Sequence, residues 1–270
     1  METFQLIGYA GALALGWIMG ATGSGGSALA VPMFNHVFLL DMHASTAHAL
    51  FVVGISAAVG AWLNQGGQKI DWRLSLLFSL PMIITVYLVR RVLLPLVPKE
   101  LFQVGGQGQV IDRDLAIMLL FGLLLTSSAL ITIRDRGPWA NTREMPRKGP
   151  LPIVAMGMGI GVLTGITGMG GGFLIVPVLL ILFKLPIKRA IATSLIVIAL
   201  KSLAGFLGDL GQVDIHWPLL YRFTALSLAG MYLGVHCSRR LADKALKKGF
   251  GFMVLGISIL VFYKALSPWV

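Results

Sequence analysis

A glycine-rich element occurs twice in this chain, and its residues could bind a small anion. Residues 16–32 read GWIMGATGSGGSALAVP, and 145 positions later residues 161–177 read GVLTGITGMGGGFLIVP. Consecutive glycines let the backbone leave helical geometry, so peptide N–H groups are exposed where the next half-helix begins. Thr22 and Thr167 precede the glycines and could cap that half-helix or donate a hydroxyl. The predicted binding residues of the two elements are Thr22, Gly23, Ser24, Gly25, Gly26, Thr167, Gly168, Gly170 and Gly171.

Close packing of helices is the alternative explanation for the glycines, because small residues commonly line helix crossings in membranes. A T-G-x-G-G run with a proline six residues further on, present in both copies, is more than packing requires. A nucleotide-binding loop is excluded because neither copy is followed by Gly-Lys-Ser/Thr or lies in a βαβ context.

Lys201 is the second candidate, because it lies in the apolar run IATSLIVIALKSLAGFLG, about eight residues from the nearest charged end. A lysine is costly at that depth in a bilayer, so it should face a cavity and have a partner. It could neutralise an anion bound at the glycines. Alternatively it forms a structural pair with a carboxylate such as Asp209, or its side chain reaches the membrane surface. Its equivalent in the first copy is Ser56.

His48 and four hydroxyl residues could complete the same site. The ordinary pKa of histidine, about 6.5, makes His48 the natural group to carry a coupled proton. His48 could equally be a partly hydrated residue at the membrane interface. Thr193 and Ser194 could line the substrate site, as could Ser45 and Thr46. For any one of these hydroxyls, a hydrogen bond to its own helix is the commoner role.

The elements that would position these residues are membrane helices. Hydrophobic residues make up 56% of the 270-residue chain and charged residues 12%, whereas soluble domains carry about a quarter charged residues. Apolar runs without period-2 alternation favour helices over a barrel. The N-terminal apolar segment is expected to belong to the mature protein, because it lies in the first copy of the repeat and no Lys or Arg precedes it. The single cysteine excludes a disulfide within the chain, and neither a cofactor nor a metal is predicted.

The apolar runs predict six spanning helices and two glycine-broken pairs of shorter segments. The shorter segments are 5–21 with 27–40, and 151–166 with 172–184; each pair could be a re-entrant hairpin or two thin crossings. The predicted spans are 45–64, 73–97, 113–133, 187–209, 217–237 and 246–266.

Positive charge gives the expected orientation. Three loops are rich in Lys and Arg and should be cytoplasmic: 134–150, 184–189 and 238–248. Segment 65–72 should also be cytoplasmic. Segment 209–216 carries Asp209 and Asp214 and should be outside. Each half then contains an odd number of crossings, so the halves are inverted relative to each other. Arg90, Arg91 and Lys99 near an outer end oppose this orientation mildly. The net charge of +11 is assigned to cytoplasmic loops and to anionic lipid or substrate, not to nucleic acid.

The chain resembles the sulfite exporter family TauE/SafE, also grouped as sulfonate-uptake permeases. The resemblance covers nearly the whole chain and rests on the doubled T-G-x-G-G element, on A-T-S-L at residues 192–195 and on G-x-V-D at residues 211–214. It implies a secondary transporter that moves sulfite, sulfonates or other small sulfur oxyanions across the bacterial inner membrane. His48 stands where the second half has Thr193, and Lys201 maps onto no general family motif, so both could mark a subgroup preference.

The sequence therefore predicts an all-α, multi-pass membrane transporter of two inverted-topology repeats, each a glycine-broken helical hairpin followed by three spanning helices. The expected organisation is a first repeat (1–133), a basic cytoplasmic linker (134–150) and a second repeat (151–270). Its expected partners are a small anion, membrane lipid and protons, and a homodimer is left open. A passive anion channel and a carboxylate transporter of the same architecture are the alternatives. An enzyme is disfavoured, since the spans contain no paired carboxylates and no HExxH.

Overall fold

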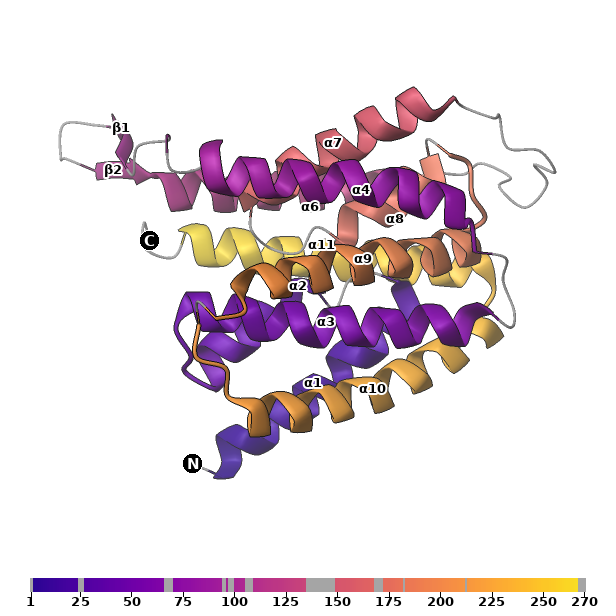
Figure 1. Ribbon diagram of the computed structural model, residues 1–270, viewed down its shortest axis with the longest axis horizontal. Coiled ribbons are helices and arrows are strands. Elements are labelled where there is room, and N and C mark those ends of the chain that lie inside the picture. The colour runs from indigo at the N-terminus through magenta and orange to yellow at the C-terminus, as the bar shows by residue number, and fades with distance from the viewer. Residues whose placement is uncertain are drawn as a thin grey trace.

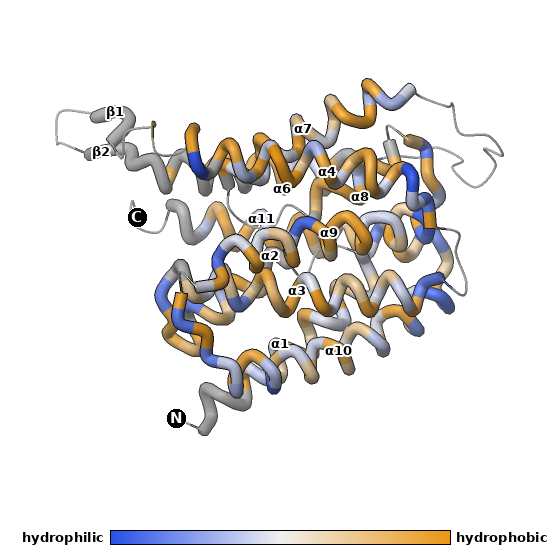
Figure 2. Tube along the Cα trace, viewed as in Figure 1, coloured by the Kyte–Doolittle hydropathy of each residue, from blue (hydrophilic) through white to orange (hydrophobic). Residues whose placement is uncertain are grey.

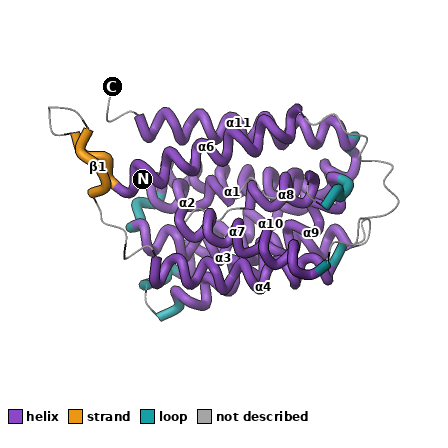
Figure 3. Tube along the Cα trace, turned by 90° about the horizontal axis from the view of Figure 1, so that it is seen from above, coloured by secondary structure: helices purple, strands orange, loops and turns teal. Residues whose placement is uncertain are grey.

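The protein is a bundle of helices that run roughly along one long axis, as Figure 1 and the perpendicular view in Figure 3 show. The computed structural model describes residues 2–23, 27–65, 70–93, 96, 100–104, 109–134, 149–167, 172–181, 183–211 and 213–266. Helices form at all six predicted spans and around both glycine runs. The expectation of a helical, multi-pass membrane protein is therefore confirmed.

The described part of the first half contains α-helices, two π-helical segments and a small sheet. Its elements are α1 (Glu2–Thr22), α2 (Ser27–Pro32) with the π-helical segment Met33–Val37, α3 (Met42–Gln65), α4 (Trp72–Leu88) with the π-helical segment Val89–Leu93, β1 (Glu100–Val104), β2 (Gln109–Asp112) and α6 (Arg113–Arg134). The second half contains α7 (Pro150–Thr167), α8 (Gly172–Ile181), α9 (Ile187–Asp209), α10 (Trp217–Arg240) and α11 (Asp243–Leu266).

Four segments within the described residues are long and apolar enough to cross a membrane: Ala44–Gln65, Trp72–Leu93, Ile187–Asp209 and Asp243–Tyr263. The outward faces of the bundle carry large apolar side chains, such as Leu80 and Ile84 on α4 and Leu260 and Tyr263 on α11, each at least 59% exposed. Apolar surface of this extent has to be covered by lipid or protein. Figure 2 shows the same distribution, with hydrophobic residues along the helices and hydrophilic residues concentrated at their ends.

Helix α9 is the most enclosed of the long helices and packs against α3. A Cβ on Gly205 would lie 3.1 Å from the Leu50 side chain, and a Cβ on Gly60 would lie 3.3 Å from the Leu195 side chain. Moving forward along α3 from Leu50 to Gly60 therefore means moving backward along α9. The two helices are antiparallel.

Glycines bring two other helix pairs into close contact. On α1, Gly16 faces the Ser227 carbonyl and Gly20 faces the Met231 carbonyl of α10; on α10, Gly230 faces the Leu13 carbonyl of α1. The pair α4–α7 is built the same way, since a Cβ on Gly161 would lie 3.0 Å from the Met82 carbonyl oxygen. Small residues at such crossings let helix backbones approach closely.

The two ends of the bundle differ in charge. The basic residues that the structure describes at one end, on the right in Figures 1 and 2, are Arg73, Arg134, Lys184, Lys188, Arg189, Arg239, Arg240 and Lys244. The opposite end holds the 210–216 connection with Asp214, the start of α3 beside Asp41 and the β1–β2 sheet, together with two exposed basic residues, Arg91 after α4 and Arg222 near the start of α10. The segments predicted to be cytoplasmic thus lie at one end and segment 209–216 at the other. Residues 135–148 of the predicted linker lie outside the described residues.

The β1–β2 sheet is an element that the sequence analysis did not predict. Its strands are antiparallel, with Phe102 opposite Ile111 and Val104 opposite Gln109. The sequence does carry a signal: two short runs with apolar and β-branched residues flank Gly-Gly-Gln-Gly at 105–108, a pattern typical of a hairpin. The predicted span 73–97 is helical from Trp72 to Leu93 and at Leu96, and residues 94, 95 and 97 lie outside the described residues.

Candidate functional site

The first glycine break begins at the end of α1, where the backbone of Gly23 adopts a positive φ of 77°. Its N–H donates to the Met19 carbonyl at 2.7 Å, which closes the last turn of α1. A Cβ at this position would also lie 2.9 Å from both Cα of Ile191 and Oγ of Ser194. Glycine is therefore required here both by backbone conformation and by space.

The first break is docked on α9, which belongs to the second half of the chain. The Ser194 hydroxyl lies 3.0 Å from the Gly23 carbonyl oxygen and 2.8 Å from the Ile191 carbonyl oxygen, so it donates to both. Next to it, the buried Thr22 hydroxyl donates to the Ile18 carbonyl of its own helix at 2.7 Å. Thr22 and Ser194 thus lie at the break as predicted, each with its hydroxyl hydrogen given to a backbone carbonyl.

The second break lies between α7 and α8, and it too is held by a serine of the opposite half. The Ser128 hydroxyl on α6 donates to the Phe173 carbonyl in the first turn of α8 at 3.3 Å, and both residues are buried. The two half-helices that follow the breaks, α2 and α8, also contact each other. Ser128 was not predicted, because nothing in the sequence marks a serine 45 residues away as a partner.

Part of the predicted site lies outside the described residues. This applies to Ser24, Gly25 and Gly26 in the first break and to Gly168, Gly170 and Gly171 in the second. Thr167 is described as the last residue of α7, without its side chain.

Helix α9 carries the remaining predicted substrate-binding residues in a largely apolar setting. Ser194 and Lys201 are seven residues apart, close to two full turns, so they share one face of α9. Lys201 is only 7% exposed. The fully buried hydroxyl of Thr193 and that of Ser202 have no hydrogen-bond partner within the described part of the chain. Buried hydroxyls normally have a partner, so these two oxygens are available to a ligand or to water.

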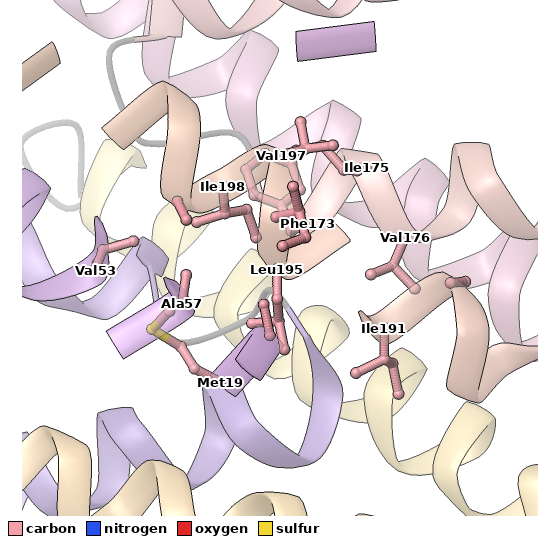
Figure 4. Packing of buried hydrophobic residues seen from close by; sticks show 14 of the residues in the cluster. Met19, Val53, Ala57, Phe173, Ile175, Val176, Ile191, Leu195, Val197 and Ile198 are labelled. Carbon is pink, nitrogen blue, oxygen red and sulfur yellow. The ribbon is translucent and has the colours of Figure 1, made fainter. Parts of the chain in front are cut away.

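Apolar side chains from both halves pack around this part of α9. Figure 4 shows Leu195 and Ile198 of α9 near Phe173 of α8, with Met19 of α1 and Ala57 of α3 close by. Because the surrounding packing is apolar, the few polar atoms on α9 would interact strongly with a charged ligand.

His48 is fully buried near the start of α3, and both of its ring nitrogens have partners. Nδ1 lies 2.7 Å from the Ala44 carbonyl oxygen, and Nε2 lies 3.1 Å from the backbone nitrogen of His216. The carbonyl requires a donor and the N–H requires an acceptor, so the imidazole is neutral with its proton on Nδ1. Nothing in the sequence indicates the His216 contact, which joins residues 168 positions apart.

The equivalent of Lys201 in the first half also makes a contact between the halves. The Ser56 hydroxyl on α3 is 2.9 Å from the Ser227 hydroxyl on α10, and both side chains are fully buried. In the sequence, Ser56 is distinguished only as the repeat equivalent of Lys201. That equivalence could have marked it as a candidate.

Comparison with known proteins agrees with this architecture. The family model for the sulfite exporter TauE/SafE matches residues 7–261. A protein of Xylella fastidiosa (strain Temecula1) named "Probable membrane transporter protein" is 25% identical over 93% of this chain and 92% of its own length. Proteins with that description in Methanocaldococcus jannaschii and Haemophilus influenzae are each 25% identical, over 86% and 94% of this chain and 87% and 96% of their own lengths. No solved structure matches the chain.

The chain belongs to the TauE/SafE family. The expectation of a membrane transporter, and not an enzyme, is thereby confirmed.

Proposed function

We propose that this member of the TauE/SafE family is a secondary transporter of a small sulfur-containing anion, sulfite or an organosulfonate, across the bacterial inner membrane. The observation that carries the proposal is the buried Lys201, which shares a face of α9 with the Ser194 that holds the first glycine break. A buried ammonium about two helical turns from the serine that holds a glycine break is suited to an anion that has shed its water.

The proposed architecture is a pair of inverted repeats. Contacts recur when both residues are shifted by the 145-residue offset: Gly16 with Ser227 becomes Gly161 with Met82, and Leu50 with Gly205 becomes Leu195 with Gly60. The equivalent helices α3 and α9 are antiparallel, as expected for a symmetry axis that runs across the helices and not along them. This supports an axis in the membrane plane, with the re-entrant pairs entering from opposite sides.

The proposed substrate site lies between the two breaks and α9. Backbone N–H groups of Gly23, Gly25, Gly26, Gly168, Gly170 and Gly171 would bind the anion's oxygens. The hydroxyls of Thr22, Ser24, Thr167, Thr193 and Ser194 would line the site. Lys201 would compensate the charge, and Thr193 has a buried oxygen with no partner among the described residues. Hydrogen bonds to a charged group are stronger than neutral ones, so few contacts are needed.

The proposed energy source is a proton carried by His48. Transport would then follow from two groups of helices, each drawn from both halves, rocking or sliding against each other around the site. The α1–α10 and α4–α7 pairs, each of which joins a helix of one half to a helix of the other through close backbone contact, are the units we expect to move as rigid bodies.

Reconstituted transport tests the proposal. Purified protein in proteoliposomes would be given sulfite, a small sulfonate, sulfate or acetate, each with and without a proton gradient. We expect gradient-dependent uptake of a sulfur oxyanion that is lost in Lys201→Ala. The matched control is Lys184→Ala, which removes an exposed lysine at the basic end.

Other outcomes separate the alternatives. Anion flux that does not depend on the proton gradient and that persists in His48→Gln would indicate a passive channel. Uptake of acetate alone would indicate a carboxylate transporter. If the Lys201→Ala protein is folded and transports normally, the site assignment is wrong.

A further inference from the structure

We infer that protonation of His48 affects helix α10 through the hydrogen bond from the backbone N–H of His216. Binding of a proton to His48 breaks that bond and releases the start of α10 from α3. This inference rests on the proposed transport function and supplies the structural step that would connect a proton to a helix movement.

The argument starts from the hydrogen-bonding capacity of the imidazole. In the structure Nδ1 donates to the Ala44 carbonyl, and Nε2 accepts from the His216 N–H at 3.1 Å. A second proton can bind only at Nε2, because Nδ1 already carries one. A protonated Nε2 is a donor and would face another donor. The contact with His216 must then break.

Breaking this contact removes the hydrogen bond that joins the start of α10 to α3, next to the packing of the Trp217 ring on the Phe51 ring of α3, whose centroids are 6.2 Å apart. His216 is the N-cap residue of α10, and its own side chain makes no capping hydrogen bond. The titratable groups near the His48 ring are Asp41, exposed just before α3, and the exposed His216 side chain. The π-helical segment after α2 contributes the uncharged ring of Phe34, whose centroid is 5.4 Å from that of His48.

Movement of α10 would be transmitted to the first glycine break. Gly230 and Gly234 of α10 face carbonyls of Leu13 and Trp17 on α1, so the two helices interlock and can shift only as a pair. Helix α1 ends at Thr22, and Ser194 holds the next residue, Gly23, against α9. A proton at His48 is therefore linked by contiguous contacts to one side of the proposed anion site.

Three variants separate this mechanism from a merely structural histidine. His48→Gln keeps an acceptor for the His216 N–H but cannot take up a proton at neutral or mildly acidic pH, so α10 should stay held. His216→Pro removes that N–H at a residue whose φ of −77° suits proline, so α10 should be released at every pH. His216→Ala removes the second imidazole but keeps the N–H, so the response should survive.

The readout is the distance between spin labels at Leu39→Cys and Tyr221→Cys, two exposed positions near the starts of α3 and α10, in a Cys237→Ser background. The full chain would be studied in lipid at pH 8 and pH 5 without substrate, alongside amide exchange of peptides that cover residues 215–220. Thermal unfolding would check that each variant is folded.

We expect the distance distribution of the parent and of His216→Ala to shift on acidification. Amide protection at the start of α10, corrected for the intrinsic rate, should fall about tenfold, the factor that one ordinary hydrogen bond contributes. His48→Gln should stay in the neutral-pH state, and His216→Pro in the acidic state. An unchanged parent distribution, or the same shift in His48→Gln, would overturn the inference. Because no anion is present, either result is independent of which substrate is transported.

Discussion

Gly23 shows how one residue can meet two separate constraints. Its φ of 77° is a conformation that L-residues adopt only with strain, and a Cβ there would clash with α9. We expect Gly23→Ala to lower the free energy of unfolding by more than the ~1–2 kcal/mol that a positive φ alone costs. The measurement is thermal unfolding of the detergent-solubilised protein.

Gly211→Ala is the control for this comparison. Gly211 has a φ of 86°, but a Cβ there would meet nothing within 4 Å. The difference between the two variants isolates the contact with Ile191 and Ser194. Equal losses in both would show that packing of the break on α9 contributes little.

A substitution at Thr193 tests substrate binding separately from folding, because it removes a single oxygen. Its fully buried hydroxyl has no described hydrogen-bond partner, so Thr193→Val should leave the thermal stability unchanged or slightly higher. If the oxygen binds the anion, KM for transport should rise about tenfold to about a hundredfold, since hydrogen bonds to charged groups contribute ~1.5–3 kcal/mol.

Thr224→Val serves as the comparison, because the Thr224 hydroxyl donates to the Leu220 carbonyl of its own helix at 2.7 Å. That change should leave KM as it is. A Thr193→Val protein with unaltered KM would remove Thr193 from the site.

At the scale of elements, the α1–α10 crossing depends on glycines whose packing role could not be predicted from the repeat pattern alone. Gly16 and Gly20 belong to the doubled element, yet they pack helices and do not line the break. The packing explanation is thus correct for these two glycines. It does not explain Gly23, whose conformation ends α1.

Gly20→Ala and Gly230→Ala should each destabilise the protein, because each added methyl would meet a backbone carbonyl that cannot move aside. Overpacking of this kind typically costs ~1–3 kcal/mol. Thermal or denaturant unfolding in detergent measures the loss. A variant that unfolds with the parent would show that the helices can separate without cost.

The matched controls are Gly159→Ala on α7 and Gly256→Ala on α11, where a Cβ would meet nothing within 4 Å. Helical glycine is ~0.5–1 kcal/mol less favourable than alanine, so these changes should be neutral or stabilising.

For the whole molecule, the charge difference between the two ends predicts its orientation in the membrane. Cysteines placed at Asp214 and at Lys184, both exposed and at opposite ends, would be labelled in a Cys237→Ser background. A membrane-impermeant reagent should reach Asp214→Cys in intact cells and Lys184→Cys only after permeabilisation. Labelling of both in intact cells would contradict the proposed topology, and the reverse pattern would invert it.

The sequence by itself determined the helical membrane character, the positions of the spans and both glycine breaks. These features are local, because an apolar run long enough to cross a bilayer must be helical, whatever its neighbours are. The 145-residue offset also identified which helices correspond. The short strands β1 and β2 were not predicted, although the hairpin pattern around Gly-Gly-Gln-Gly is present in the sequence.

Only the tertiary structure decided what each glycine and polar residue touches. It separated the glycines that pack α1 on α10 from Gly23, and it placed Ser194 and Ser128 each on the break of the opposite half. It also gave His48 its partner in His216. The physical reason is that these contacts join residues between 45 and 217 positions apart. Hydropathy and periodicity act over one or two turns and carry no information about them.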